Sequence, residues 1–114
     1  IFYEKYFMTI TLKKEDFKKT DYVSKLLLAA YEGNLEYIEF CMLQGFSPNS
    51  IDEKGRTPLM VSAYKGKERV VRYLLENKAD PTNKDNEGNT ALDYAEAGEN
   101  ENILFLLRAS MPEE

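Results

Sequence analysis

The side chains of this chain with obvious chemistry are one cysteine and twenty carboxylates. Two carboxylates act as general acid and base when burial or a facing partner shifts their pKa values apart. Here Asp52, Asp85 and Glu87 fall in segments of turn composition. Glu36 and Glu68 fall on helix faces that we expect to be exposed. No spacing forces two carboxylates together, so the sequence predicts solvated acids and no catalytic pair.

The other routes to catalysis or ion binding are no stronger. Histidine is absent, which removes the commonest general base and metal ligand. The run 85–89 superficially suggests a calcium loop but lacks the 12-residue pattern that ends in a bidentate glutamate. Cys41 aligns with Leu74 and Leu107 in the repeat described below, so we expect a small buried hydrophobe. We therefore predict no enzyme activity, no cofactor and no metal.

The elements that carry these side chains repeat along the chain with a fixed period. Asp52, Gly55, Thr57, Leu59 and Leu74 recur 33 positions later as Asp85, Gly88, Thr90, Leu92 and Leu107. Counting back by the same step, Leu59, Ala63, Tyr64, Gly66 and Pro81 map onto Leu26, Ala30, Tyr31, Gly33 and Pro48. A period of this length indicates a stacked repeat protein. Such arrays more often bind another macromolecule than enclose a catalytic pocket.

The middle unit shows what each repeat forms. Asp52 and Gly55 have turn composition, because glycine accepts positive φ at little cost. Thr57 is the predicted N-cap of a short helix that has proline at its first position and ends at Gly66. Apolar residues within 70–75 then predict a second helix. Neither helix buries its apolar side alone, so the units must stack.

The run Gly55-Arg56-Thr57-Pro58-Leu59, followed by Ala63 and Gly66, resembles an ankyrin repeat with its T-P-L-H-x-A signature. The resemblance implies an all-α fold, an ankyrin-repeat solenoid of stacked helix-turn-helix units with β-turn or hairpin tips. It implies an ankyrin-repeat domain over 21–114, with units at about 21–51, 52–84 and 85–111.

The outer units depart from the pattern. Unit one has Ser24 at the threonine position and Tyr22 where the turn glycine belongs. Unit three has Glu96 where the other units have alanine, and Arg108 where unit two has Leu75. Because a terminal repeat presents a polar outer face, Glu96 and Arg108 predict a C-terminal cap.

Residues 1–20 form a predicted capping or linker segment, and three interpretations of it stay open. The segment is too apolar for a solvated tail, with Phe2, Tyr3, Tyr6, Phe7, Met8, Ile10, Leu12 and Phe17. In the first interpretation the segment covers the open end of unit one. In the second it is the last part of a preceding domain, and in the third it binds a partner or another copy of the chain. The alternation over 7–12 is typical of an edge strand. Since the chain does not begin with methionine, we expect a fragment or a processed product.

Charge and composition bound the partner and the location. The net charge is −5; five lysines against three acids give residues 1–20 a charge of +2, which leaves −7 for the rest. This balance disfavours nucleic acid and favours a basic or polar protein partner. No apolar run reaches the roughly 20 residues that span a bilayer. We expect a monomer in the cytoplasm or another intracellular place, and a secreted effector remains open.

The resemblance also implies where a partner binds. In the family, partners usually meet the turn tips and the exposed side of the first helices, which line a concave groove. The matching tip residues are Ile51, Glu53, Lys54, Arg56, Lys84, Asn86, Glu87 and Asn89. The matching first-helix residues are Tyr31, Glu32, Tyr64, Lys65 and Ala97.

Tyr31 and Tyr64 share one register, so we expect an aromatic row there. With Arg56 these two are the leading candidates, since tyrosine and arginine are enriched in binding hot spots. The alternative is that each tyrosine ring packs against the neighbouring turn. Tyr37 and Tyr73, by contrast, align with apolar positions and are expected in the core, and so is Tyr94.

These observations predict a non-enzymatic protein–protein interaction module that binds a protein through its concave groove. One alternative is a regulatory or targeting fragment of a larger multidomain enzyme or effector. A second is a structural role through self-association of the N-terminal segment. Within the first prediction, the second-helix face with Lys67, Glu68, Arg69 and Arg72 is the competing binding surface.

Overall fold

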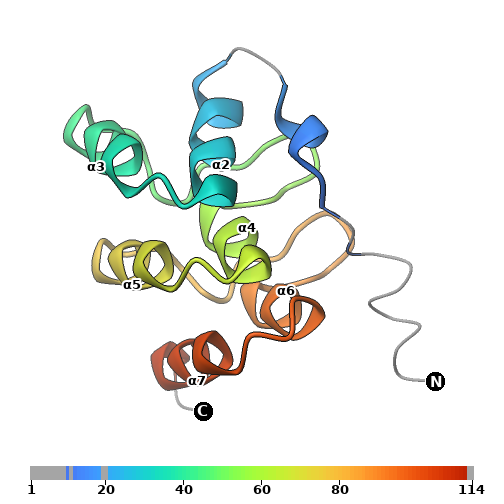
Figure 1. Ribbon diagram of the computed structural model, residues 1–114. Coiled ribbons are helices and arrows are strands. Elements are labelled where there is room, and N and C mark those ends of the chain that lie inside the picture. Colours follow the sequence, from blue (N-terminus) through green and yellow to red (C-terminus); the bar gives the residue numbers. More distant parts are fainter. Residues whose placement is uncertain (1–9, 11, 19–20, 113–114) are drawn as a thin grey trace.

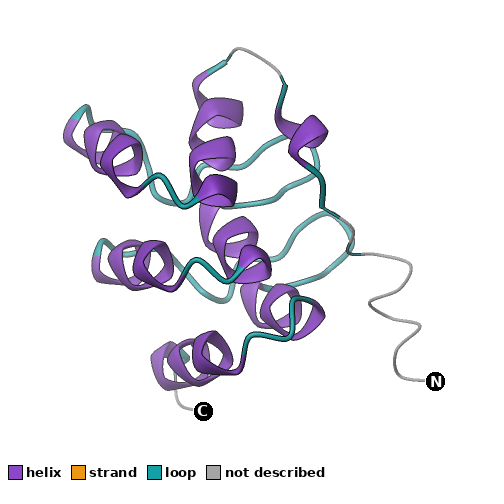
Figure 2. Cartoon of the chain, viewed as in Figure 1, coloured by secondary structure: helices purple, strands orange, loops and turns teal. Residues whose placement is uncertain are grey.

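The fold is a stack of helix pairs, seen in a computed structural model that describes residues 10, 12–18 and 21–112 (Figure 1). Its elements are the short 3₁₀ helix η1 (Lys14–Phe17) and the helices α2 (Tyr22–Glu32), α3 (Leu35–Leu43), α4 (Pro58–Lys65), α5 (Glu68–Glu76), α6 (Ala91–Ala97) and α7 (Glu101–Ser110). No strand occurs within these ranges (Figure 2). The all-α prediction is therefore confirmed.

The helices form two layers. The first helices α2, α4 and α6 pack side by side in one layer, and α3, α5 and α7 lie in the other (Figure 1). Loops project beyond the first-helix layer on the side away from α3, α5 and α7 (Figure 2). This is the stacked helix-turn-helix arrangement that the 33-residue period predicts.

The capping residues of the middle and last units act as predicted. The hydroxyl of Thr57 accepts a hydrogen bond from the Met60 N–H at 3.2 Å, and Gly66 ends α4 with a φ of 72°. Thr90 caps α6 in the same way. Each cap satisfies an amide that the first helical turn leaves without a partner.

Unit one begins differently. The Asp21 carboxylate, and not Ser24, caps α2, and it accepts a hydrogen bond from the Ser24 N–H at 2.9 Å. As a result α2 includes Tyr22, the residue at the turn-glycine position, and its ring stacks on Phe46 with centroids 4.4 Å apart. The first helix therefore extends about one turn beyond the register of units two and three.

The tips of units two and three are tight turns that are joined to each other. In each turn the first and last residues pair through the backbone, Asp52 N to Arg56 O at 3.2 Å and Asp85 N to Asn89 O at 2.8 Å. The Asn86 N–H then donates to the Lys54 carbonyl at 2.9 Å. The Asn86 side-chain amide donates to the backbone carbonyl of the adjacent Glu53 at 2.9 Å. The predicted β-turn tips are thus confirmed. The backbone hydrogen bonds between the two tips involve too few residues to form strands.

The core runs through all three units. Cys41 is fully buried among apolar side chains, as predicted, and burial raises the pKa of its thiol. Tyr94 is also buried as predicted, whereas Tyr37 and Tyr73 are only half-buried. Unit three lies so close to unit two that a Cβ at Gly98 would collide with the backbone oxygen of Tyr64.

The outer face of unit three is polar. Glu96 and Arg108 lie 4.0 Å apart across it, with partly exposed side chains. This placement agrees with the predicted cap, because neither charged side chain enters the core.

Candidate functional site

The described part of the N-terminal segment lies along the repeat array. η1 sits beside α2 on the side away from α3 (Figure 1). Its side chains contact both unit one and Arg56 of unit two, while Tyr22 and Lys25 of unit one remain exposed. The described residues of the segment thus pack against α2 and the middle tip, and the prediction that the segment covers the open end of unit one stays a prediction. The predicted edge strand at 7–12 falls mostly outside the described residues.

Arg56 is the centre of the contact between η1 and the middle tip. Its Nε and Nη2 atoms bond Asp52 Oδ2 at 2.9 and 2.8 Å, and its Nη1 atom bonds Asp16 Oδ2 at 3.3 Å. The guanidinium carbon lies 4.8 Å from the centroid of the Phe17 ring. Only 7% of the Arg56 side chain is exposed. Two carboxylates and an aromatic ring therefore enclose this predicted tip residue, and its contact with a partner stays a prediction.

The first-helix residues of unit one are also engaged within the chain. The Tyr31 ring lies 5.9 Å from the Phe17 ring, and Lys65 Nζ lies over Tyr31 at 4.8 Å. Glu32 pairs with Lys14 at 2.9 Å, and this hydrogen bond raises the pKa of the lysine. Tyr31 therefore packs within the chain, against Phe17 of η1 and Lys65 of α4.

Asn89, another predicted tip contact, is buried. Its backbone N–H donates to Asp85 Oδ1 at 2.8 Å and helps to close the turn. The other carboxylate oxygen of Asp85 accepts a hydrogen bond from the Tyr94 hydroxyl at 2.6 Å. Burial raises the pKa of Tyr94, and the adjacent Asp85 carboxylate raises it further. Asp85 and Tyr94 thus stabilise the turn on its buried side, and Asn89 contributes to closing that turn.

The remaining predicted residues form an open surface on units two and three. The exposed side chains belong to Ile51, Glu53, Lys54, Lys65, Lys84, Asn86 and Glu87, and Tyr64 and Ala97 are half-buried. Ile51 exposes 58% of its surface and is the large aliphatic residue of this surface. Glu53 and Lys54 line the same hollow as Ile51. The structure thus gathers the tip residues of both units on one side.

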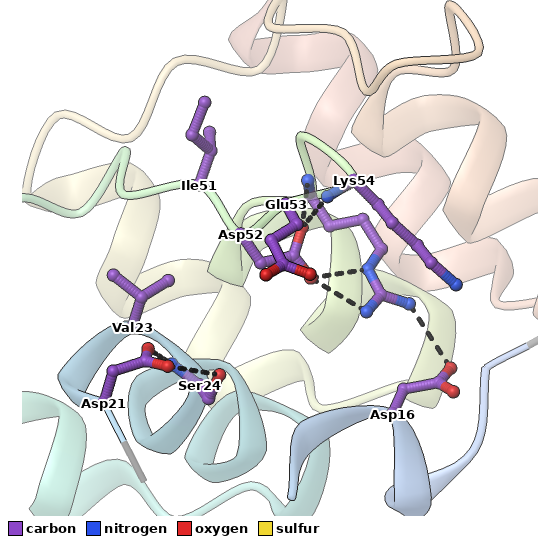
Figure 3. A pocket seen from close by; sticks show the side chains of 9 residues that line it. Asp16, Asp21, Val23, Ser24, Ile51, Asp52, Glu53 and Lys54 are labelled. Carbon is purple, nitrogen blue, oxygen red and sulfur yellow. Dashed lines mark hydrogen bonds and ion pairs between the residues drawn. The ribbon is translucent and has the colours of Figure 1, made fainter. Parts of the chain in front are cut away.

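A shallow hollow of about 380 Å³ lies where η1, the start of α2 and the middle tip meet. Figure 3 shows Asp16 entering from η1 and Asp52 from the tip, with Ile51 on the rim. The hollow carries more acidic than basic side chains, which are Asp16, Asp21, Asp52 and Glu53 against Lys54 and Arg56. Of these charged groups, Arg56 pairs with both Asp16 and Asp52.

Comparison with known families decides which kind of repeat this is. A model of ankyrin repeats in three copies matches residues 26–113. The chain belongs to the ankyrin repeat family. A comparison with curated proteins finds no match. Ankyrin repeats are generally protein–protein interaction modules and typically non-enzymatic, which agrees with the arrangement of the tips.

Among the residues that the structure describes, no group of three or more cysteine, aspartate or glutamate side chains could hold a metal ion. No helix in the same ranges is long and apolar enough to cross a membrane.

Sequence reasoning missed the role of η1. Asp16 and Lys14 contact two residues of the predicted surface, Arg56 and Glu32, only because the chain folds back across it. One signal was present: Phe17 is a single aromatic residue within a run of charged residues, a composition typical of a docked anchor.

Proposed function

We propose that the ankyrin domain binds a protein partner through the open tips and first helices of units two and three. The observation that carries this proposal is the joined pair of tips. Hydrogen bonds from Asn86 hold the two turns together, and the neighbouring side chains of Ile51, Lys54 and Lys84 are exposed. A surface that is ordered before binding loses less conformational entropy when a partner docks.

The composition of the surface fits a protein. A solvent-exposed isoleucine surrounded by charges of both signs has the character of a small apolar centre with a polar rim. A phosphate backbone would require clustered positive charge, and Glu53 and Glu87 interrupt it here.

The test uses two variants with matched chemistry. The tip variant combines Ile51→Ser, Lys54→Glu and Lys84→Glu. The control combines Phe105→Ser, Arg69→Glu and Arg72→Glu on the second-helix face, where Phe105 and both arginines are exposed. Each variant removes one exposed apolar side chain and reverses two positive charges.

The measurement is affinity capture from a lysate of the source cell, followed by titration of the purified captured protein. We expect the tip variant to bind at least about tenfold more weakly than the native chain and the control to bind normally, since a few interface residues carry most of the affinity. The opposite pattern would place the site on the second-helix face. Equal binding by all three chains would reject both surfaces.

A further inference from the structure

The η1 segment contacts the first-unit end of the concave surface in the manner of a bound peptide. Phe17 is its anchor, with 2% of its surface exposed, between the Tyr31 ring and the Arg56 guanidinium. Asp16 supplies the charge next to it. One buried aromatic anchor beside one charge pair is the usual composition of a binding hot spot.

Leu12 is a second buried residue of the segment, with 8% of its surface exposed, and the charged residues of the segment are exposed. Lys13, Lys14, Glu15 and Lys18 face solvent. The backbone hydrogen bond of η1, from Asp16 N to Lys13 O, lies within the segment itself. Side-chain contacts with Tyr31, Glu32 and Arg56 attach it to the repeats. All three belong to the surface that the family resemblance assigns to partners.

We propose that residues 12–18 are an intramolecular ligand of this surface, and that they are displaced by a partner peptide in which a carboxylate side chain directly precedes an aromatic one. The proposal rests on the proposed function of the concave surface. It extends that surface from units two and three to the end that η1 covers.

The geometry of Arg56 sets the carboxylate requirement. Asp52 occupies the Nε and Nη2 atoms, whereas Nη1 is the atom that reaches Asp16. An incoming peptide must supply an anion at Nη1, because a mostly buried guanidinium that loses an anionic partner is destabilised. The fork of the guanidinium fixes where that anion lies.

The space left by Phe17 sets the aromatic requirement. The Arg56 cation lies over the Phe17 ring, and this ring is tilted by 54° against the Tyr31 ring. An aliphatic side chain would fill the volume without the cation–π contact. The acid and the ring must be adjacent in sequence, as Asp16 and Phe17 are.

The internal segment competes more effectively for the surface than a free peptide does, because it is tethered to the domain. Phe17 lies five positions before the first residue of α2. A tether this short gives an effective concentration of roughly millimolar order. A free peptide therefore competes poorly with the native segment and binds well once that segment is weakened.

The test adds a fluorescein-labelled peptide with the sequence of residues 10–20 to the full chain and follows its anisotropy. The protein is the native chain or the Asp16→Asn, Phe17→Ser variant. We expect the variant to bind the peptide at least about tenfold more tightly than the native chain does. A control peptide carrying the same two substitutions should bind the variant at least about tenfold more weakly than the native peptide.

Circular dichroism of each chain checks the fold, and a milder Asp16→Asn, Phe17→Leu variant replaces the first if that one unfolds. Equal affinity of the two peptides for a folded variant would overturn the proposal. Unfolding of both variants would overturn it too, because the segment would then be an integral part of the domain. The measurement uses no cellular partner, so its failure is distinct from failure of the tip variant in the capture experiment.

Discussion

Replacing Arg56 by methionine should destabilise the domain far more than the same change at Arg72. Both arginines pair with an acid four residues earlier at nearly the same distance, 2.8 Å to Asp52 and 2.9 Å to Glu68. They differ in burial. The side chains of the first pair are 7% and 13% exposed, and those of the second are 55% and 38% exposed.

The expected magnitudes follow from that difference. Removing one partner of a buried ion pair costs about 3–5 kcal/mol, because the other charge is left in a poorly solvated place. Asp52 keeps two backbone donors, the N–H groups of Lys54 and Arg56 at 2.9 Å. We therefore expect the lower end, about 3 kcal/mol for Arg56→Met. The exposed pair is screened by water, so Arg72→Met should cost about 0.5 kcal/mol or less.

Urea unfolding followed by circular dichroism measures both. With a slope of about 2 kcal/mol per molar urea, the midpoint should fall by about 1.5 M for Arg56→Met and by about 0.2 M for Arg72→Met. Comparable losses in the two variants would refute the argument that burial determines the value of the pair. A loss below about 1 kcal/mol for Arg56→Met would refute it as well.

Three further predictions concern the contacts between and within units. Tyr94→Phe removes the 2.6 Å bond to Asp85 and should cost about 2 kcal/mol in urea unfolding. The pKa of Tyr94 is raised in the folded state, so above about pH 10 the unfolded state loses a proton that the folded state keeps. The free energy of unfolding should therefore fall above that pH, and it should fall less in Tyr94→Phe. An equal fall in both chains would contradict this. Gly98→Ala should lower the free energy of unfolding by about 2 kcal/mol, since the new methyl group meets the backbone carbonyl of Tyr64. A thermal midpoint equal to that of the native chain would show that units two and three are not closely packed there. Asn49→Ala removes bonds to two backbone groups of unit two at 2.8 and 3.2 Å and should cost about 1–2 kcal/mol by thermal unfolding, whereas an unchanged midpoint would mean that water replaces them.

The parts of the fold that sequence predicts well are those determined by nearby residues. Thr57 and Gly66 set the start and end of α4 through contacts within a few positions, and both act as expected. The same holds for the repeat itself, since each unit carries its own caps and apolar stripe. The start of α2 differs from that of the other first helices because Asp21, which has no capping counterpart in units two and three, caps the helix in place of Ser24.

The candidate site was predicted less completely because it depends on a distant contact. Arg56 and Asp16 are 40 positions apart, and periodicity carries no information about where a segment outside the repeat lies. By contrast, the turn composition around Lys54 and Lys84 was enough to predict that both side chains are exposed, as they are in the structure. It could not show that Phe17 covers Arg56, since that depends on the path of the chain before α2.

The way in which the tips are joined affects how this protein can diverge. Lys54 enters the connection through its backbone carbonyl group, and Asn86 contributes its side-chain amide across the gap. Substitution at position 54 therefore leaves the hydrogen bonds between the turns in place. Natural selection can replace such a residue in successive lineages while the architecture is inherited unchanged. Asn86 does not have that freedom, so among related chains we expect it to persist where Lys54 varies.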